Sequence, residues 1–186
     1  MPKKKQPVSV YQLKVTLKES SPPIWRRIQV NSDISLYKLH QILQVVMGWL
    51  DYHLHQFVIH GEYYGVPEPD FDFEVKNEKR VKLNQVASRP GDKIVYEYDF
   101  GDSWEHVILL EKILEPEDRG HYPICLKGKR ACPPEDCGGI WGYYDLLEAM
   151  QDPAHPEHDD ILEWLESNFE PEEFDVDLVN KKLKTI

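Results

Sequence analysis

The stretch Lys93-Ile-Val-Tyr-Glu-Tyr-Asp-Phe-Gly-Asp-Ser-Trp-Glu-His-Val-Ile-Leu-Leu-Glu111 decides the fold of this 186-residue chain. Both of its arms are rich in β-branched and aromatic residues, and apolar side chains recur at every second position. This pattern is typical of half-buried β-strands. Gly101-Asp102-Ser103 separates the two arms, so the sequence predicts an antiparallel hairpin with a three-residue turn over residues 93–111.

A three-residue turn also sets the register of this hairpin. With Phe100 opposite Trp104, one face of the hairpin is nearly all apolar, and a shift by one residue would break that match. Glycine stands first in the turn, whereas three-residue turns usually place it last. The other cross-strand pairs that this register predicts are Tyr98–His106, Tyr96–Ile108, Ile94–Leu110, Val95–Leu109 and Lys93–Glu111.

The same register brings polar groups together at one end of the hairpin. Asp99 faces Glu105, and like charges opposite each other destabilise a sheet. A cation, or an arginine from elsewhere in the chain, would relieve this repulsion. The alternative is purely structural: Asp102 forms the turn, Asp99 accepts hydrogen bonds from backbone amides, and His106 packs within the sheet. The sequence leaves both interpretations open.

Periodicity along the rest of the chain predicts an α+β fold with a mostly antiparallel or mixed sheet. Asn31 to Ser35 supply helix-capping residues, and apolar residues then recur with helical spacing from Leu36 to Met47, just before Gly48. Further strands are expected over residues 8–18, 24–30 and 52–60, and further helices over residues 141–150, 161–169 and 175–183. The strand–strand–helix–strand–strand order of the first half suggests a β-grasp-like (ββαββ) arrangement.

The length of the chain suits a single domain, which we expect to span residues 1–186. Residues 1–7 are expected to form a disordered tail, and residues 8–114 the sheet with its helix. Residues 115–186 are expected to hold a long irregular loop, over residues 121–139, followed by the C-terminal helices. Residues 65–77 are expected to form a surface loop.

Composition and charge limit the classes of function. The chain is 41% hydrophobic with a net charge of −11, and residues 111–186 hold the whole acidic excess, with 19 acidic and 8 basic residues. An acidic surface repels phosphate backbones, so nucleic-acid binding is not expected, apart from a role for Lys3-Lys4-Lys5. No apolar run reaches the ~18 residues of a membrane span, and no signal peptide is recognised. We therefore expect a cytoplasmic protein without membrane contact.

One group of candidate site residues combines imidazole and carboxylate side chains. His53 and His55 stand two residues apart in a predicted strand, so both are expected on one face. Such side chains could bind a divalent metal ion, such as zinc, that activates a water molecule. The spacing matches no short metalloenzyme motif, and histidines packed in a sheet are the simpler explanation. The candidate catalytic residues are Asp99, Asp102, His106, Glu135 and Asp136, and the candidate metal ligands are His53, His55, Asp102 and His106.

A second candidate metal site consists of His121, Cys125, Cys132 and Cys137, four soft ligands within 17 residues. Zinc binds such ligands tetrahedrally, but the close Cys-x-x-Cys pair of most structural zinc sites is missing. The alternative is that the thiols are small buried apolar groups. Three cysteines, an odd number, do not indicate a disulfide framework.

A set of motifs runs through nearly the whole chain, from Val10 to Asn180. The motifs are Pro22-Pro-Ile-Trp-Arg-Arg27, Leu39-His40 with Gly48-Trp49, His53-Leu-His-Gln-Phe57, Tyr98-Asp-Phe-Gly-Asp-Ser-Trp-Glu-His106, and Gly128 with Pro133-Pro-Glu-Asp-Cys-Gly-Gly139. Together they resemble the plasmid pRi-type ORF-three-like family, also described as insertion-element passenger proteins. The resemblance implies an association with mobile elements but no established biochemical activity.

These observations favour a soluble binding or interaction module whose partner is unidentified, because no complete catalytic motif occurs. The second hypothesis is a metal-dependent hydrolase that uses the histidine and aspartate cluster near the hairpin. The third is nucleic-acid binding through the basic N-terminus. The sequence leaves open whether the chain is an enzyme, and it names no cofactor beyond a divalent metal.

Overall fold

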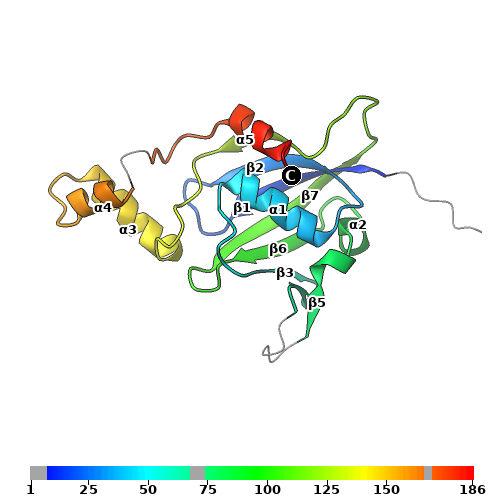
Figure 1. Cartoon of the computed structure of the whole chain (residues 1–186), viewed down its shortest axis with the longest axis horizontal. Coiled ribbons are helices and arrows are strands. Elements are labelled where there is room, and N and C mark those ends of the chain that lie inside the picture. The colour runs from blue at the N-terminus through cyan, green and yellow to red at the C-terminus, as the bar shows by residue number, and fades with distance from the viewer. Residues whose placement is uncertain (1–7, 68–73, 166–168) are drawn as a thin grey trace, which may run out of the picture.

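One eight-stranded sheet forms the centre of the computed structural model, which describes residues 8–67, 74–165 and 169–186 (Figure 1). The strands are β1 (Val10–Leu17), β2 (Trp25–Asn31), β3 (His55–Ile59), β4 (Glu62–Gly65), β5 (Val75–Asn77), β6 (Lys93–Tyr98), β7 (Trp104–Leu114) and β8 (Ile124–Lys129). Their order is β5-β4-β3-β6-β7-β1-β2-β8, and each pair of neighbours is antiparallel except β4 and β5. The predicted α+β class with a mixed, mostly antiparallel sheet is confirmed.

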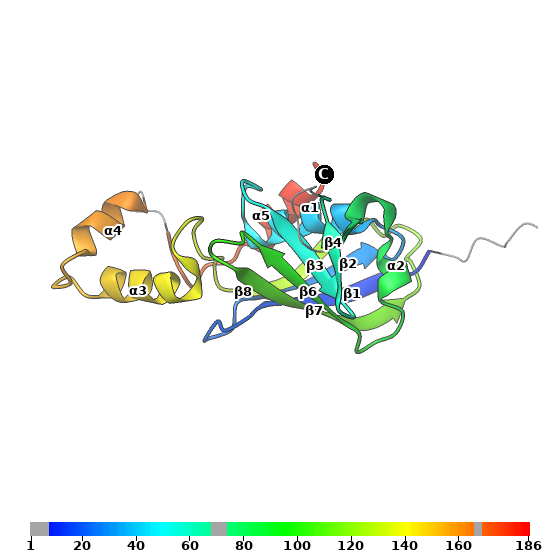
Figure 2. The same cartoon turned by 90° about the horizontal axis from the view of Figure 1, so that it is seen from below.

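The helices lie on one face of the sheet and at one of its ends. They are α1 (Leu36–Met47), the 3-10 helix η1 (Glu78–Arg80), α2 (Leu83–Val86), α3 (Gly139–Gln151), α4 (His158–Trp164) and α5 (Val176–Leu183). Figure 2 shows α1 and α5 above the sheet, whereas α3 and α4 project from one end as an arm. The predicted tail over residues 1–7 and residues 68–73 of the predicted surface loop lie outside the described residues. The β-grasp likeness and the single domain stay predictions.

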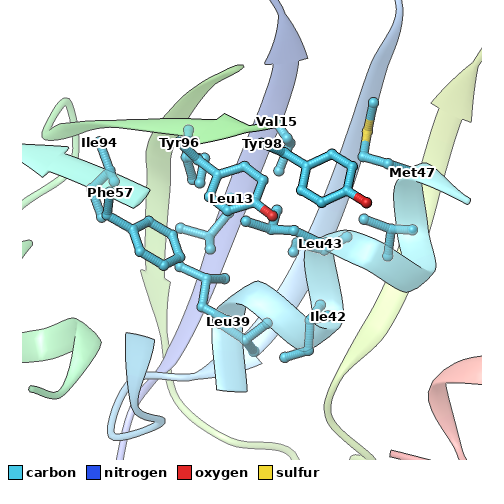
Figure 3. Close-up of a cluster of buried hydrophobic side chains, with 14 of the residues drawn as sticks. Leu13, Val15, Leu39, Ile42, Leu43, Met47, Phe57, Ile94, Tyr96 and Tyr98 are labelled. Carbon is cyan, nitrogen blue, oxygen red and sulfur yellow. The ribbon is translucent and has the colours of Figure 1, made fainter. Parts of the chain in front are cut away.

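Helix α1 supplies much of the core, as its spacing predicts. Ser35 caps its N-terminus by accepting a hydrogen bond from the Lys38 amide at 3.1 Å, and Gly48 ends it with a φ of 105°. The buried face includes Leu39 and Leu43, which pack against side chains of the sheet as Figure 3 shows. Such burial contributes roughly 1.5–3 kcal/mol for each large side chain before entropy is subtracted. Residues at the end of α1 are therefore held firmly against the sheet.

The central hairpin is present, but its predicted register is wrong by two residues. Tyr98, rather than Phe100, faces Trp104, and the loop extends over residues 99–103. Asp99 and Ser103 adopt positive φ angles of 58° and 54°, and the Ser103 amide donates to the Asp99 carbonyl at 2.6 Å. These turns end β6 at Tyr98, two residues earlier than a three-residue loop would, while β7 begins at Trp104 as predicted. Because the shift is even, the apolar face stays the same, and Tyr96, Tyr98, Trp104 and His106 are all buried.

The charges along the hairpin also differ from the prediction. Glu97, not Asp99, faces Glu105, and Lys18 pairs with Glu105 while Gln56 donates to Glu97 at 2.7 Å. A cation from a neighbouring strand thus relieves the like-charge contact. The predicted Lys93–Glu111 pair does not form either, because Lys93 faces Leu109 and both Glu111 oxygens accept from Arg27 at 2.7 and 2.8 Å.

The segment over residues 121–139 is not irregular throughout, contrary to the prediction. Residues 124–129 form β8, which pairs with β2 at the edge of the sheet. The strand is short and contains Gly128, so its apolar alternation is weak. Asn180 of α5 hydrogen-bonds to the free edge of β8. Its side-chain amide accepts from the Cys125 backbone N–H at 2.8 Å and donates to the Cys125 carbonyl oxygen at 2.9 Å. An edge strand covered in this way is protected from pairing with other chains.

The C-terminal helices follow the predicted order with changed boundaries. The helix predicted over residues 161–169 is α4, which starts at His158 and ends at Trp164, and residues 166–168 lie outside the described part of the chain. The predicted Asp175 cap of α5 is confirmed, because its carboxylate accepts from the Leu178 amide at 2.9 Å. In the described ranges, no helix is both long enough and apolar enough to cross a bilayer.

Candidate metal centre

Three segments that are distant in the sequence meet beside the end of α1. His53 lies between α1 and β3, Asp99 begins the β6–β7 loop, and Glu135 and Asp136 precede α3. The Nε2 atom of His53 is 3.0 Å from Asp136 Oδ1, 3.6 Å from Asp99 Oδ2 and 3.8 Å from Glu135 Oε2. The described part of the chain shows no Lys or Arg paired with these three carboxylates. We call these four residues the His53 cluster.

The Nε2 atom of His53 is the feature that makes this cluster unusual. It is shielded from solvent, yet it has no hydrogen-bond partner of acceptable geometry. Buried polar atoms are nearly always hydrogen-bonded. Here the nitrogen lies 3.0 to 3.8 Å from three carboxylate oxygens without a hydrogen bond to any of them, and an ion bound by these groups would give it a partner.

Asp99 and Glu135 are held rigidly by backbone groups. Asp99 is buried, and its Oδ1 accepts from the Gly101 amide at 2.9 Å, which leaves Oδ2 directed toward His53. Glu135 Oε1 accepts from the Leu50 amide at 2.8 Å and from the Tyr98 hydroxyl at 3.2 Å. Burial, together with the neighbouring Glu135 charge, raises the pKa of Tyr98, so its hydroxyl stays a donor at physiological pH.

Three aspartates beside this region adopt the left-handed conformation that most residues avoid. Asp51, Asp99 and Asp136 have φ angles of 60°, 58° and 56°. Aspartate tolerates this region better than most side chains do, but the conformation still costs free energy and recurs at functional sites. Asp136 has 67% of its side chain exposed, so it marks the open side of the cluster.

Asp102, a candidate ligand in the sequence, does not face His53. Its Oδ2 accepts from the Gly138 amide at 3.2 Å, and its carbonyl oxygen would lie 2.6 Å from a Cβ placed on Gly139. The β6–β7 loop therefore holds the segment before α3 by direct backbone contact. Asp102 therefore contacts the segment that follows Asp136 and is not itself part of the cluster.

Replacing Gly139 with alanine is expected to lower the free energy of unfolding by about 2–4 kcal/mol and to displace Asp136. The new Cβ meets backbone that cannot move aside cheaply, and the φ of 71° adds strain of about 1 kcal/mol. Gly61→Ala is the matched control, since Gly61 has a φ of 81° but no heavy atom within 4 Å of the new Cβ. Urea unfolding of both variants measures the difference. Equal losses of unfolding free energy in the two variants would show that the close contact between Gly139 and Asp102 does not contribute to stability.

His55 does not join His53, although the sequence pattern places them on one face of a strand. β3 begins only at His55, so His53 lies outside the strand; the His53 ring contacts Tyr98, whereas the His55 ring contacts Tyr96. His55 Nε2 lies 2.8 Å from Glu78 Oε2, and its ring stacks on His40 with centroids 3.4 Å apart and planes 4° apart. His40 also lies within hydrogen-bond distance of the Tyr96 hydroxyl and of Asp51.

This second cluster brings the ligand atoms of His40, Asp51 and His55 within 4.8 Å of one another. A ring nitrogen binds a metal through its in-plane lone pair, and one ion cannot lie in two parallel planes 3.4 Å apart. The cluster is therefore better explained as hydrogen-bonded core pairs. Sequence reasoning missed His40, although a titratable residue beside Leu39 on the apolar face of α1 was a usable signal.

His106 and the cysteines also lie away from the His53 cluster. His106 is fully buried, with Nδ1 3.2 Å from the Tyr96 carbonyl oxygen and its ring against Trp49. Cys125 is buried within β8, and the metal-compatible groups found among the described residues contain no cysteine. Burial raises the pKa of Cys125 to about 11 and that of Cys137 to about 12, which keeps both thiols protonated. The structure thus does not assemble the four ligands His121, Cys125, Cys132 and Cys137.

Fold and cluster together define an α+β protein with a mixed eight-stranded sheet and a surface group of one histidine and three carboxylates. The chain belongs to the plasmid pRiA4b ORF-3-like family, whose model matches residues 9–178. The family resemblance noted in the sequence is thereby confirmed.

Two relatives show how far the similarity extends. The uncharacterized protein y4hQ of Sinorhizobium fredii (strain NBRC 101917 / NGR234) is 40% identical over 161 residues, which cover 86% of this chain and 82% of y4hQ. The crystal structure of MM3350, a protein of unknown function from Methanosarcina mazei Go1, matches with a TM-score of 0.84 and 40% identity. That match covers 92% of this chain and 98% of MM3350. The structure of MM3350 supports the fold, and the descriptions of both relatives give no activity.

Proposed function

We propose that this chain is a binding module that holds a divalent metal ion at the His53 cluster and uses the ion to bind a partner. The observation that carries the proposal is the shielded His53 Nε2, which lies 3.0 to 3.8 Å from three carboxylate oxygens and has no hydrogen bond. The ligand atoms of His53, Asp99 and Asp136 lie within 4.8 Å of one another, a separation compatible with metal bonds of about 2.0–2.2 Å after small adjustments. One imidazole with carboxylates suits zinc or manganese.

Exposed apolar side chains around the cluster support binding to a macromolecule. Leu50, Tyr52 and Leu54 alternate with the acidic and histidine residues of the same segment, and Tyr52 is 72% exposed. Phe100 is exposed next to Asp99 on the opposite loop. Aromatic and apolar groups around a polar centre are typical of interaction surfaces. A ligand that supplies an oxygen atom to the ion would contact these side chains as well.

Asp99→Asn is expected to weaken Zn²⁺ binding by about 100-fold, because even changes to the residues behind a metal ligand cost about 10- to 100-fold. Isothermal titration of the metal-free chain with Zn²⁺ and with Mn²⁺ measures the affinity and the stoichiometry. Asp102→Asn is the matched control, because it removes the same charge nearby but keeps an acceptor for the Gly138 amide. The proposal fails if no stoichiometric site is found, or if both variants bind equally.

Metal-dependent hydrolysis is the second candidate function, and the position of Glu135 favours it. Its Oε2 is 3.8 Å from His53 Nε2, close enough to act as a general base toward a water molecule on the ion. The test is turnover of p-nitrophenyl acetate and p-nitrophenyl phosphate by metal-loaded protein. Turnover that is lost in Glu135→Gln while metal binding is retained would replace the binding proposal with a hydrolase.

Two other hypotheses gain no support from the described residues. The basic segment Lys3-Lys4-Lys5 lies outside the described residues, and the acidic charge still opposes nucleic-acid binding. An association with mobile elements rests on the family resemblance and stays a prediction.

A further inference from the structure

A groove of about 620 Å³ opens next to the His53 cluster. The end of α1 forms one wall, the segment over residues 131–135 the second, and α5 with lining residues from 169–175 the third; residues 164 and 165 at the end of α4 also line the groove. Leu50 and Glu135 belong both to this groove and to the surroundings of the cluster. The groove and the candidate metal centre therefore form one continuous surface.

The walls of the groove are apolar and well supported. The Trp49 indole donates to the Pro133 carbonyl oxygen at 3.2 Å, which joins two of the walls. The ring of Phe174 lies 3.8 Å from the Arg26 guanidinium, and it packs where Gly128 leaves room for it. Leu178 is 48% exposed on the α5 wall, so apolar surface is available to a ligand. A groove with fixed walls needs little ordering when it binds.

The charges that line the groove are mainly acidic. Glu135, Glu170, Glu173 and Asp175 line it, and none of them forms an ion pair with Lys or Arg among the described residues. Arg26 is buried, and its Nε and Nη1 atoms donate to three backbone carbonyl groups. Lys182 is the remaining basic residue of the lining. A ligand that fits must therefore combine apolar side chains with positive charge.

We propose that this groove binds an amphipathic basic segment of a partner protein. Its apolar side chains would enter between Trp49, Phe174 and Leu178, and its lysine or arginine side chains would meet the acidic lining. The acidic side chains of the groove select a basic segment over the alternatives. An acidic segment would be repelled by like charges, and a purely apolar segment would leave the carboxylates of the groove without a partner of opposite charge. The proposal does not depend on the metal, because Glu135 is the one groove residue named here that also belongs to the His53 cluster, and the groove variants tested below leave Glu135 unchanged.

The probe is a fluorescein-labelled synthetic peptide of about 18 residues. Its leucine residues are placed at helical spacing so that they form one face of a helix, and its lysine residues form the other face. Fluorescence anisotropy with the full chain is expected to show saturable 1:1 binding, weakened at least about tenfold when glutamate replaces every lysine of the peptide. Absence of saturable binding, or equal binding of the acidic peptide, would overturn the proposal.

Two pairs of variants locate the binding. Glu173→Lys and Glu117→Lys change the net charge equally, but only Glu173 lines the groove. Leu178→Ser and Trp141→Ser each remove an exposed apolar side chain, but only Leu178 lines the groove. Glu173→Lys and Leu178→Ser are each expected to weaken binding about five- to tenfold, while the controls stay within about twofold.

Equal effects within each pair would mean nonspecific attraction to an acidic surface and would overturn the groove assignment. Asp99→Asn keeps the proposals separate, because it should weaken Zn²⁺ binding about 100-fold but leave peptide affinity unchanged within about twofold. A failure of the metal site and a failure of the groove would therefore give different results.

Discussion

Replacing Arg26 with methionine is expected to lower the free energy of unfolding by about 3–5 kcal/mol, the largest effect expected of a single side chain here. Arg26 is only 1% exposed, and its guanidinium donates to the carbonyl oxygens of Val46 at 2.7 Å, Trp25 at 2.9 Å and Lys129 at 3.0 Å. Methionine fills much of the same volume but leaves these acceptors unpaired, and each buried unpaired acceptor costs about 1–3 kcal/mol.

The position of Arg26 explains why no neighbour can compensate. Val46 lies in the last turn of α1, which holds no basic residue of its own, so Arg26 of β2 satisfies this helix end. The Lys129 carbonyl belongs to β8, so one side chain joins α1 to two strands. Burial lowers the pKa of Arg26 only to about 10, and it therefore stays charged at pH 7.

Arg27→Met is the control for this prediction. Arg27 pairs with Glu111 on the more exposed face of the sheet, with 30% of its side chain accessible, and such pairs contribute about 1 kcal/mol or less. Urea unfolding at pH 7 measures both variants. If the two substitutions lower the free energy of unfolding equally, the hydrogen bonds of Arg26 to three carbonyl groups do not stabilise the fold more than the exposed Arg27–Glu111 pair does.

Lowering the pH from 7.5 to 5 is expected to reduce the free energy of unfolding by about 4 kcal/mol through His40 and His106. Burial lowers the pKa of His40 to about 3 and that of His106 to about 4. An unfolded histidine has a pKa of about 6.5. Below pH 6.5 the unfolded chain binds protons that the folded chain excludes, so stability is complete above that pH and falls as the pH decreases.

The size of this loss of stability follows from the interval of about 1.5 pH units between the unfolded histidine pKa of about 6.5 and pH 5. At about 1.36 kcal/mol for each pH unit, each histidine contributes about 2 kcal/mol at pH 5. The groups around His40 are Asp51, Tyr96, His55 and Glu78. Asp51 would favour a protonated ring, but more than half of its side chain is exposed, so solvent weakens its effect and burial dominates. For a chain of this size the melting temperature should fall by roughly 10 °C.

His106→Asn tests the contribution of one site. Asparagine keeps a donor for the Tyr96 carbonyl but cannot titrate, so about 2 kcal/mol of the pH dependence should disappear. His121→Asn is the control, because the His121 side chain is exposed in the folded chain. Denaturant unfolding at pH 7.5, 6 and 5 gives the slopes. A stability that does not change with pH would contradict the prediction, as would an unchanged slope in His106→Asn.

Local patterns were sufficient wherever neighbouring residues decide the structure. The cap at Ser35, the apolar spacing of α1 and the cap at Asp175 were all readable, because each depends on residues within one or two turns. The alternation along Lys93–Tyr98 and Trp104–Leu114 identified the buried face of the hairpin even though the register was shifted. The same reasoning missed β8, whose short alternation is interrupted by Gly128.

The sequence by itself determined the α+β class, the hairpin, α1 and the residue types from which a metal centre could be built. Only the tertiary structure decided which of those residues meet. It separated His53 from His55 at the start of β3, placed His106 in the core, and brought Asp136 to Asp99 by seating Gly139 on the backbone of Asp102. The physical reason is that strand ends, positive φ angles and close backbone contacts depend on how the whole sheet packs, whereas caps and periodicity depend on local spacing.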